Sequence, residues 1–222
     1  MRIHIGFQAA ALSCLVAALA QAAGPAHFTK AGLAMVESQT HALVDRGAAA
    51  GIVTLVLQEG KPVFRDAYGF ADAERKSPMR VDSVMAIASM TKPVTGVAMM
   101  MLFEEGKWQL DDPVAKHVPQ LRDLKVLAAD DQLVSPAHQP TMRELMSHSA
   151  GFTYGVFADT PADQRVRAMV LTDPNSSLAG MIGKLSQLPL KHAPGSAWEY
   201  SVSVDIQGYI VEKLSGLPYA EF

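Results

Sequence analysis

Apolar residues recur with helical spacing soon after the first third of the chain. Starting from Val94 they fall at i, i+3, i+4, i+7 and i+8, and methionines fill the faces between them. A proline is tolerated only in the first turn of a helix, so Pro93 limits the start, and Gly106 is typical of a helix end. The pattern predicts a helix that begins at Ser89, runs to Gly106 and is buried on nearly all sides.

The stretch before this helix predicts one helix and two strands. Partly helical apolar spacing over 30–46, closed by Gly47, predicts an amphipathic helix. A continuous run of β-branched residues and leucines over 51–58, a turn at 59–61 and a second run over 63–68 predict a hairpin. Residues 71–83 are polar and predict a loop.

The rest of the chain predicts helices. Leu110-Asp111-Asp112-Pro113 breaks the apolar pattern, and a capping box at Thr141-Met142-Arg143-Glu144 opens a helix through Ser147. Further segments are predicted as a short turn-containing stretch over 114–119, helices over 162–171 and 176–187, and a last helix that follows Ser201 and stops at Gly216.

This order of elements predicts an α+β fold, with an antiparallel sheet flanked by helices and a helical subdomain over about 107–195. Two strands alone are too few for a stable layer. We therefore expect the chain to be incomplete at its C-terminus, with strands of the sheet missing.

Composition excludes some classes of function. The chain has 222 residues, of which 49% are hydrophobic and 18% charged, and its formal net charge is -3. These values are typical of a globular protein and provide no basic surface for nucleic acid. Small neutral or mildly charged molecules remain as ligands.

The first 23 residues predict a secretory signal. Arg2 and His4 precede an apolar stretch over 9–20, and small residues follow at positions suited to cleavage. We expect a periplasmic or secreted protein, with a domain over 24–222 and no membrane span after cleavage. Cys14, the single cysteine, lies inside the signal, so the mature chain would have neither a disulfide nor a thiol nucleophile, and Cys14 as a lipid anchor is the alternative.

Ser89 and Lys92 are candidates for nucleophilic catalysis. Residues three apart share a helix face, so Lys92 is expected beside the Ser89 hydroxyl. A serine hydroxyl is a weak nucleophile, and an amine made less basic by burial can accept its proton. An S-x-x-K pattern alone is equally consistent with a helix cap followed by a surface lysine, so other motifs must decide.

Other candidate motifs predict structural roles. Ser147-His148-Ser149-Ala150-Gly151 approximates the G-x-S-x-G elbow, but it lacks the first glycine and follows a helix where that motif follows a strand. We interpret it as a structural turn, with His148 as a hydrogen-bonding loop residue. The seven histidines have no spacing typical of a metal site, and we expect neither a metal nor another cofactor.

Several segments in this order resemble the serine β-lactamase and penicillin-binding protein superfamily. The resemblance covers about 30–222 and is greatest to class C β-lactamase-like hydrolases and family VIII carboxylesterases. It implies a sandwich of the β-lactamase/transpeptidase type. The segments that carry it are 86–94 around Ser89 and Lys92, Leu110 to Val114, Leu145 to Gly151, and Pro194-Gly195 before Glu199-Tyr200-Ser201.

The resemblance implies a role for each matched residue. Ser89 would be the acylated nucleophile and its backbone N–H an oxyanion donor, Lys92 would accept the serine proton, and Tyr200 would be a second acid or base. A nearby ammonium would lower the normally high pKa of this tyrosine. Ser201 and Val202 would contact the substrate.

Two features depart from the family pattern. Val202 stands where lactamases have an asparagine that contacts the substrate amide, and this favours an esterase. No Lys-Thr-Gly, His-x-Gly or Trp-x-Gly segment follows Tyr200 to supply the second oxyanion donor. Loss of one such donor typically costs about a hundredfold or more in rate.

The sequence therefore predicts a serine hydrolase that acts through an acyl-enzyme on Ser89, as a carboxylesterase on small esters. One alternative is a β-lactamase or D-Ala-D-Ala carboxypeptidase. The other is a non-catalytic relative or an inactive fragment.

Overall fold

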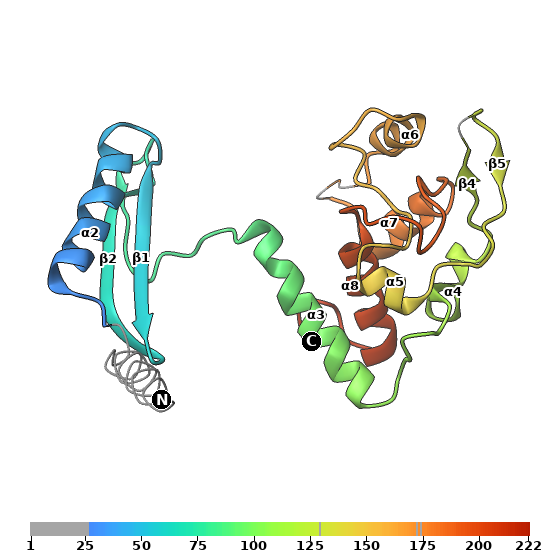
Figure 1. Cartoon of the computed structure of the whole chain (residues 1–222), viewed down its shortest axis with the longest axis horizontal. Helices are drawn as coiled ribbons and strands as arrows, with labels where there is room; N and C mark the ends of the chain where they lie inside the picture. Colours follow the sequence, from blue (N-terminus) through green and yellow to red (C-terminus); the bar gives the residue numbers. More distant parts are fainter. Residues whose placement is uncertain (1–26, 129, 172, 174) are drawn as a thin grey trace, which may run out of the picture. The chain divides into compact units, whose positions relative to one another are not determined.

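The computed structural model describes residues 27–222 except 129, 172 and 174, so the predicted signal at 1–23 lies outside the described residues. The chain divides into two compact units between Ala86 and Ile87 (Figure 1). No helix among the described residues is long and apolar enough to cross a membrane.

The first unit consists of one helix packed on a small antiparallel sheet. Helix α2 (Lys30–Asp45) lies against β1 (Gly51–Gln58) and β2 (Lys61–Asp72), and the two strands pair from Gly51 opposite Gly69 to Gln58 opposite Lys61 (Figure 1). These elements confirm the predicted helix and hairpin.

The predicted loop over 71–83 is wrong in part, because a third strand forms there. Strand β2 continues to Asp72, and β3 (Ser77–Pro78) pairs with it, so this sheet has the order β1-β2-β3. A strand of two residues is too short to produce an alternating pattern that sequence analysis could detect.

The second unit is mainly helical. Its predicted helices are confirmed, whereas the two-stranded pairing of β4 with β5 was not predicted. The elements are η1 (Ala88–Met90), α3 (Thr91–Glu104), α4 (Val114–His117), η2 (Pro119–Leu121), β4 (Val126–Leu127), β5 (Leu133–Val134), α5 (Met142–Met146), α6 (Pro161–Met169), α7 (Leu178–Leu185) and α8 (Ser203–Ser215).

The core of this unit is organised around α8. Ile206, Ile210 and Val211 on this helix are fully buried, and α3, α5 and α7 pack against it. Thr141 caps α5 with the predicted box, since its side chain accepts from the Glu144 N–H and the Glu144 carboxylate accepts from the Thr141 N–H. The mixture of helices and antiparallel sheet confirms the predicted α+β class.

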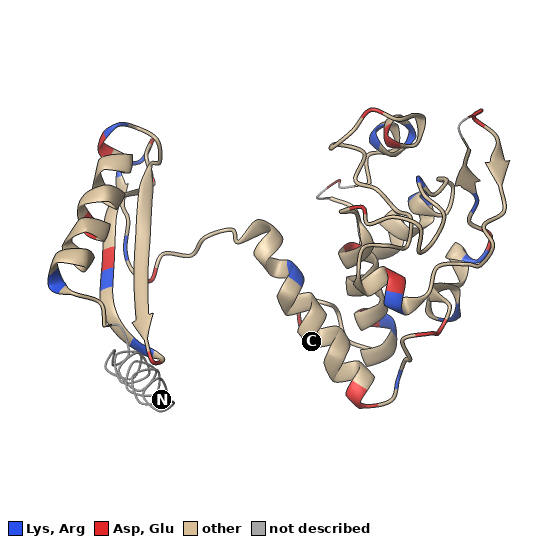
Figure 2. Cartoon of the chain, viewed as in Figure 1, with Lys and Arg blue, Asp and Glu red and all other residues tan. Residues whose placement is uncertain are grey.

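The prediction that α3 is buried on nearly all sides is wrong for the structure described. Only Thr95, Met99 and Leu102 are buried, while Val94 and Val97 are more than half exposed. Helix α8 covers one face of α3, and an apolar sequence does not say what covers the others. In Figure 2 α3 is mostly tan, because Lys92 and Glu104 are its only charged residues.

Candidate active site

Three predicted catalytic residues lie together in the second unit. Ser89 lies in η1, directly before α3, and Lys92 lies in the first turn of α3. The Lys92 ammonium donates to Ser89 Oγ at 3.4 Å, and the Tyr200 hydroxyl donates to the same oxygen at 2.8 Å. The fold therefore brings the hydroxyls of Ser89 and Tyr200, 111 positions apart in the chain, into direct contact.

The backbone next to the serine is strained. Ala88 has φ of 45°, in the left-handed region. This conformation costs a residue with a Cβ about 1 kcal/mol or more, and such strain is typical of functional sites. The turn that it makes leads the chain into η1 and places Ser89 at the start of the helix.

A turn that contains His148 holds the segment carrying Tyr200. The backbone carbonyl of His148 accepts a hydrogen bond from the Glu199 N–H at 2.9 Å, and the ring Nδ1 of His148 accepts one from the Ser201 N–H at 3.2 Å. Tyr200 is thus fixed on both sides. The structure confirms the prediction of His148 as a hydrogen-bonding residue in a structural turn, and partial burial lowers the pKa of its ring.

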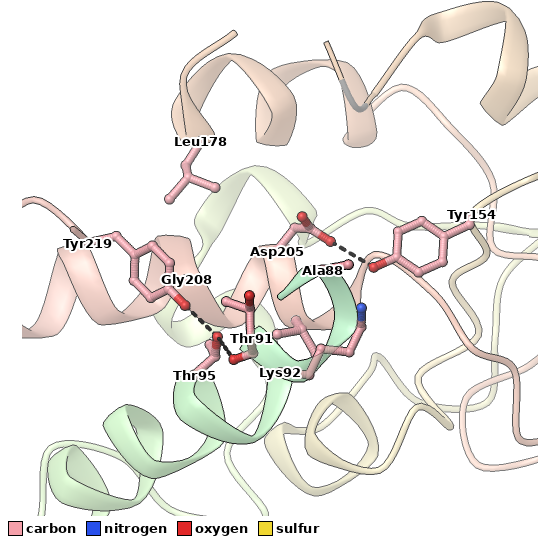
Figure 3. Close-up of a pocket in the computed structure, with 10 residues that line it drawn as sticks. Ala88, Thr91, Lys92, Thr95, Tyr154, Leu178, Asp205, Gly208 and Tyr219 are labelled. Atoms are coloured by element: carbon pink, nitrogen blue, oxygen red, sulfur yellow. Dashed lines mark hydrogen bonds between the residues drawn. The ribbon is translucent and has the colours of Figure 1, made fainter. Parts of the chain in front are cut away.

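Sequence analysis missed Tyr154 and Asp205 as members of the site. The Tyr154 hydroxyl donates to Asp205 Oδ2 at 3.3 Å, and the Lys92 side chain extends toward Tyr154 (Figure 3). The Lys92 ammonium lies 4.6 Å from the centre of the Tyr200 ring and 5.4 Å from that of Tyr154. A polar residue near the start of the apolar α8 was the available signal for Asp205, whereas nothing in the pattern marked Tyr154.

A cavity of about 190 Å³ adjoins this cluster. Lys92, Tyr154 and Asp205 contribute polar groups to its lining, and the hydrogen-bonded pair of Thr95 and Tyr219 also lines it (Figure 3). Burial raises the pKa of the Asp205 carboxyl.

The basicity of Lys92 differs from the prediction. Partial burial lowers the pKa of Lys92, but hydrogen bonding with the Tyr200 and Tyr154 hydroxyls raises it by more, so the pKa lies above its usual value. The sequence had predicted an amine made less basic by burial. Hydrogen bonds with Lys92 and Ser89 lower the pKa of Tyr200, which agrees with the expectation for this tyrosine.

Ser201 and Val202, the predicted substrate contacts, lie in the interior instead. Val202 is fully buried in the core, and Ser201 is 1% exposed. The Ser201 hydroxyl bonds to His148 Nδ1 and to the Ser203 hydroxyl. Neither side chain is therefore exposed for contact with a substrate in this structure.

A buried ion-pair network supports the two loops that carry the tyrosines. The Lys191 ammonium contacts Asp163 at 3.2 Å and Glu199 at 2.7 Å, and Thr153 donates to Asp163 at 2.7 Å. Because Thr153 and Glu199 adjoin Tyr154 and Tyr200 in sequence, the network links both loops to α6. Burial alone would raise the pKa of Asp163, but hydrogen bonds from Thr160 and Thr153 and the contact with Lys191 lower it to about 2.

One group among the described residues has the geometry of a metal site, and it lies in the first unit. Glu37, His41 and Asp66 each offer one ligand atom, all within 4.8 Å of one another. The bond of 2.8 Å between His41 Nε2 and Asp66 Oδ2 accounts for most of this arrangement.

Comparison with known proteins places this mixed fold, with its serine, lysine and tyrosine, in an established family. Residues 36–222 match the Beta-lactamase family, and the chain belongs to that family. This confirms the resemblance inferred from the motifs.

Two curated relatives are esterases by name. The chain is 32% identical to esterase EstB of Burkholderia gladioli, covering 77% of this chain and 42% of EstB. It is 28% identical to lovastatin esterase of Penicillium rubens, covering 84% of this chain and 48% of that enzyme.

A solved structure matches the fold. EstCE1, described as a hydrolase with promiscuous acyltransferase activity, superposes with a TM-score of 0.74 at 29% identity, covering 85% of this chain and 49% of EstCE1. The chain therefore spans just under half the length of these relatives.

Proposed function

We propose that this protein hydrolyses small carboxylic esters through an acyl-enzyme on Ser89. The observation that carries the proposal is the position of Ser89 Oγ, which accepts hydrogen bonds from the Tyr200 hydroxyl and the Lys92 ammonium. Two curated relatives named as esterases support the choice of an ester substrate.

In the acylation step, Tyr200 as phenolate accepts the proton of Ser89. The serine oxygen then forms a bond to the ester carbonyl carbon, the bond from that carbon to the alkoxy oxygen breaks, and the Tyr200 proton passes to the departing alkoxide. Lys92 remains an ammonium and stabilises the phenolate, because its pKa is raised while that of Tyr200 is lowered. We thus assign the proton transfer to Tyr200 in place of Lys92.

In deacylation, a water molecule gives its proton to Tyr200 and attacks the acyl carbon, and the proton returns to Ser89 as the acyl-enzyme breaks down. The Ser89 backbone N–H at the start of the helix would be one donor to the oxyanion.

The main rival is a β-lactamase or D-Ala-D-Ala carboxypeptidase. The test compares p-nitrophenyl acetate and butyrate with nitrocefin, using the full chain and Ser89→Ala as the matched control. We expect the full chain to have a higher kcat/KM on the short esters than on nitrocefin. Ser89→Ala should not hydrolyse the esters. A higher kcat/KM on nitrocefin would favour the lactamase, and no turnover of any substrate would favour a non-catalytic relative.

We also propose that the protein is exported, from the signal pattern at 1–23. Expression with a secretion-competent host should release a form that begins near residue 24, as read by mass spectrometry. An intact Met1 in the periplasmic or secreted fraction would contradict cleavage.

A further inference from the structure

Four aromatic rings surround Tyr200. The ring centres of His148, Tyr154, Phe157 and Trp198 lie 5.1, 5.5, 5.8 and 6.3 Å from that of Tyr200. These distances are within the range of favourable aromatic contacts. The tyrosine that contacts Ser89 therefore forms an aromatic surface together with these four rings.

The two outer rings of this surface are open to solvent. Trp198 is 68% exposed and Phe157 is 65% exposed, whereas Trp108 in the core of the same unit is 1% exposed. Both outer rings are nevertheless packed on one edge, Trp198 against His148 and Phe157 against Tyr154. Exposed apolar surface beside a reactive group marks a ligand-binding site, and rings already held in place lose little freedom on binding.

We propose that Trp198 and Phe157 form a subsite for an aromatic ring in the alcohol part of the ester. This inference rests on the proposed function, in which Tyr200 returns its proton to the departing alkoxide. A general acid must lie within about 3 Å of the atom that it protonates. The alkoxy oxygen therefore sits at the Tyr200 hydroxyl, and the group attached to it extends over the rings packed around Tyr200.

The acyl part is directed differently. Its carbonyl carbon bonds to Ser89 Oγ, so the acyl chain extends from the serine. The subsite thus predicts selectivity for the alcohol of the substrate and little selectivity for an aromatic acyl group.

The test uses acetates of 2-phenylethanol and 1-propanol, two alcohols of similar acidity. Trp198→Ala and Phe157→Ala should each lower kcat/KM on 2-phenylethyl acetate by about fivefold to tenfold more than on propyl acetate, which is the effect of losing one aromatic contact with the substrate. Trp198→Phe keeps a ring and should restore most of the loss. Leu133→Ala, which shortens another exposed apolar side chain of this unit, should change neither ester.

Propyl phenylacetate identifies the side of the ester that is bound. If Trp198→Ala lowers kcat/KM on this substrate and spares 2-phenylethyl acetate, the ring lies on the acyl side and the proposal is wrong. Equal effects on 2-phenylethyl and propyl acetate, or no effect on either, would also overturn it.

A binding measurement separates this proposal from the proposed function. In Ser89→Ala, 2-phenylethyl acetate should change the fluorescence of exposed Trp198, and Phe157→Ala in the same background should weaken binding by about fivefold to tenfold. Binding by Ser89→Ala with no hydrolysis by the unaltered chain would support the subsite and reject the esterase. Hydrolysis by the unaltered chain without this binding would support the esterase and reject the subsite.

Discussion

The Tyr200 hydroxyl donates a hydrogen bond of 2.8 Å to Ser89 Oγ, whereas Ser149, the other serine with a motif-like context, has a different partner. Among the described residues, the side-chain partner of Ser149 Oγ is the hydroxyl of Ser147, at 2.9 Å. The aliphatic hydroxyl of Ser147 is a poor base, because it does not ionise in the range in which a tyrosine does. The two serines should therefore differ sharply in reactivity.

A fluorophosphonate probe should label Ser89 in the full chain. The reaction needs a base to remove the serine proton, and Ser89 has Tyr200 and Lys92 beside it. Peptide mass spectrometry should place the label on Ser89, and Ser89→Ala should abolish it while Ser149→Ala retains it. A label on Ser149 would reject the assignment of the nucleophile.

The pH dependence of ester hydrolysis should report the titration of Tyr200. The phenolate is the active form, so kcat/KM should rise with pH through an apparent pKa below 10, the usual value for tyrosine. Lys92→Met removes the ammonium that lowers this pKa, so the rise should move to higher pH. Lys92→Arg keeps a positive charge and should move it less.

Asp205→Asn should move the same profile in the opposite direction. The Asp205 carboxylate raises the pKa of Tyr200 through its negative charge, and the amide removes that charge with little change in shape. The rise in kcat/KM should therefore begin at lower pH. Identical profiles for Asp205→Asn and Lys92→Met would show that Tyr200 is not the titrating group.

His148 should act on catalysis through the position of Tyr200. His148→Ala leaves the N–H of buried Ser201 without its acceptor, which should lower the free energy of unfolding by about 1–3 kcal/mol. His148→Asn should recover most of the lost free energy of unfolding, because asparagine offers a hydrogen-bond acceptor and tolerates φ of 57°. Urea unfolding followed by tryptophan fluorescence reports on the second unit, which contains both tryptophans.

The same variants separate positioning from folding. We expect His148→Ala to lower kcat by a larger factor than it changes KM. The substitution should displace Tyr200 and leave the surface that binds the substrate in place. An equal loss of activity in His148→Ala and His148→Asn would show that the hydrogen bond accepted at position 148 does not position Tyr200.

Local chemistry made much of this structure predictable from the sequence. The capping box at Thr141, the glycine after α8 and the spacing of Ser89 and Lys92 all act within a few residues, so their patterns survive in the sequence. The family motifs added Tyr200, which no local rule connects to Ser89.

Contacts between distant segments account for the parts that the sequence did not predict. Tyr154 meets Asp205 across 51 positions, and whether Lys92 gains or loses basicity depends on which hydroxyls the fold brings to it. Val202 illustrates the same limit, because its match to the family's substrate-binding position did not reveal that the fold buries it in the core.

Gly151 should be intolerant of any side chain. Its φ is +91°, and an added Cβ would lie 2.2 Å from the carbonyl oxygen of His192. Gly151→Ala should therefore lower the free energy of unfolding by more than about 3 kcal/mol, as measured in urea. Gly183 in α7 is the matched control, because nothing lies within 4 Å of its added Cβ. Gly183→Ala should stabilise the protein by about 0.5–1 kcal/mol, and a similar loss in both variants would contradict the structure.

Asp163 should make the second unit sensitive to acid. Its carboxyl is fully buried, accepts hydrogen bonds from Thr153 and Thr160, and has a pKa of about 2. Because this pKa is below the unfolded value of about 3.9, the stability it provides is complete above pH 4 and is lost as the pH falls toward 2. The difference amounts to about 2 kcal/mol.

Urea unfolding at a series of pH values from about 7 to about 2, in steps of about one pH unit, isolates this contribution. The free energy of unfolding of the unaltered chain should fall more steeply below pH 4 than that of Asp163→Asn, which starts lower and has no carboxyl to protonate. Asp111→Asn removes a carboxylate that is 84% exposed and should keep the steep slope. If Asp163→Asn and the unaltered chain lose stability in parallel, the buried network of Asp163 and Lys191 contributes nothing to the acid limit.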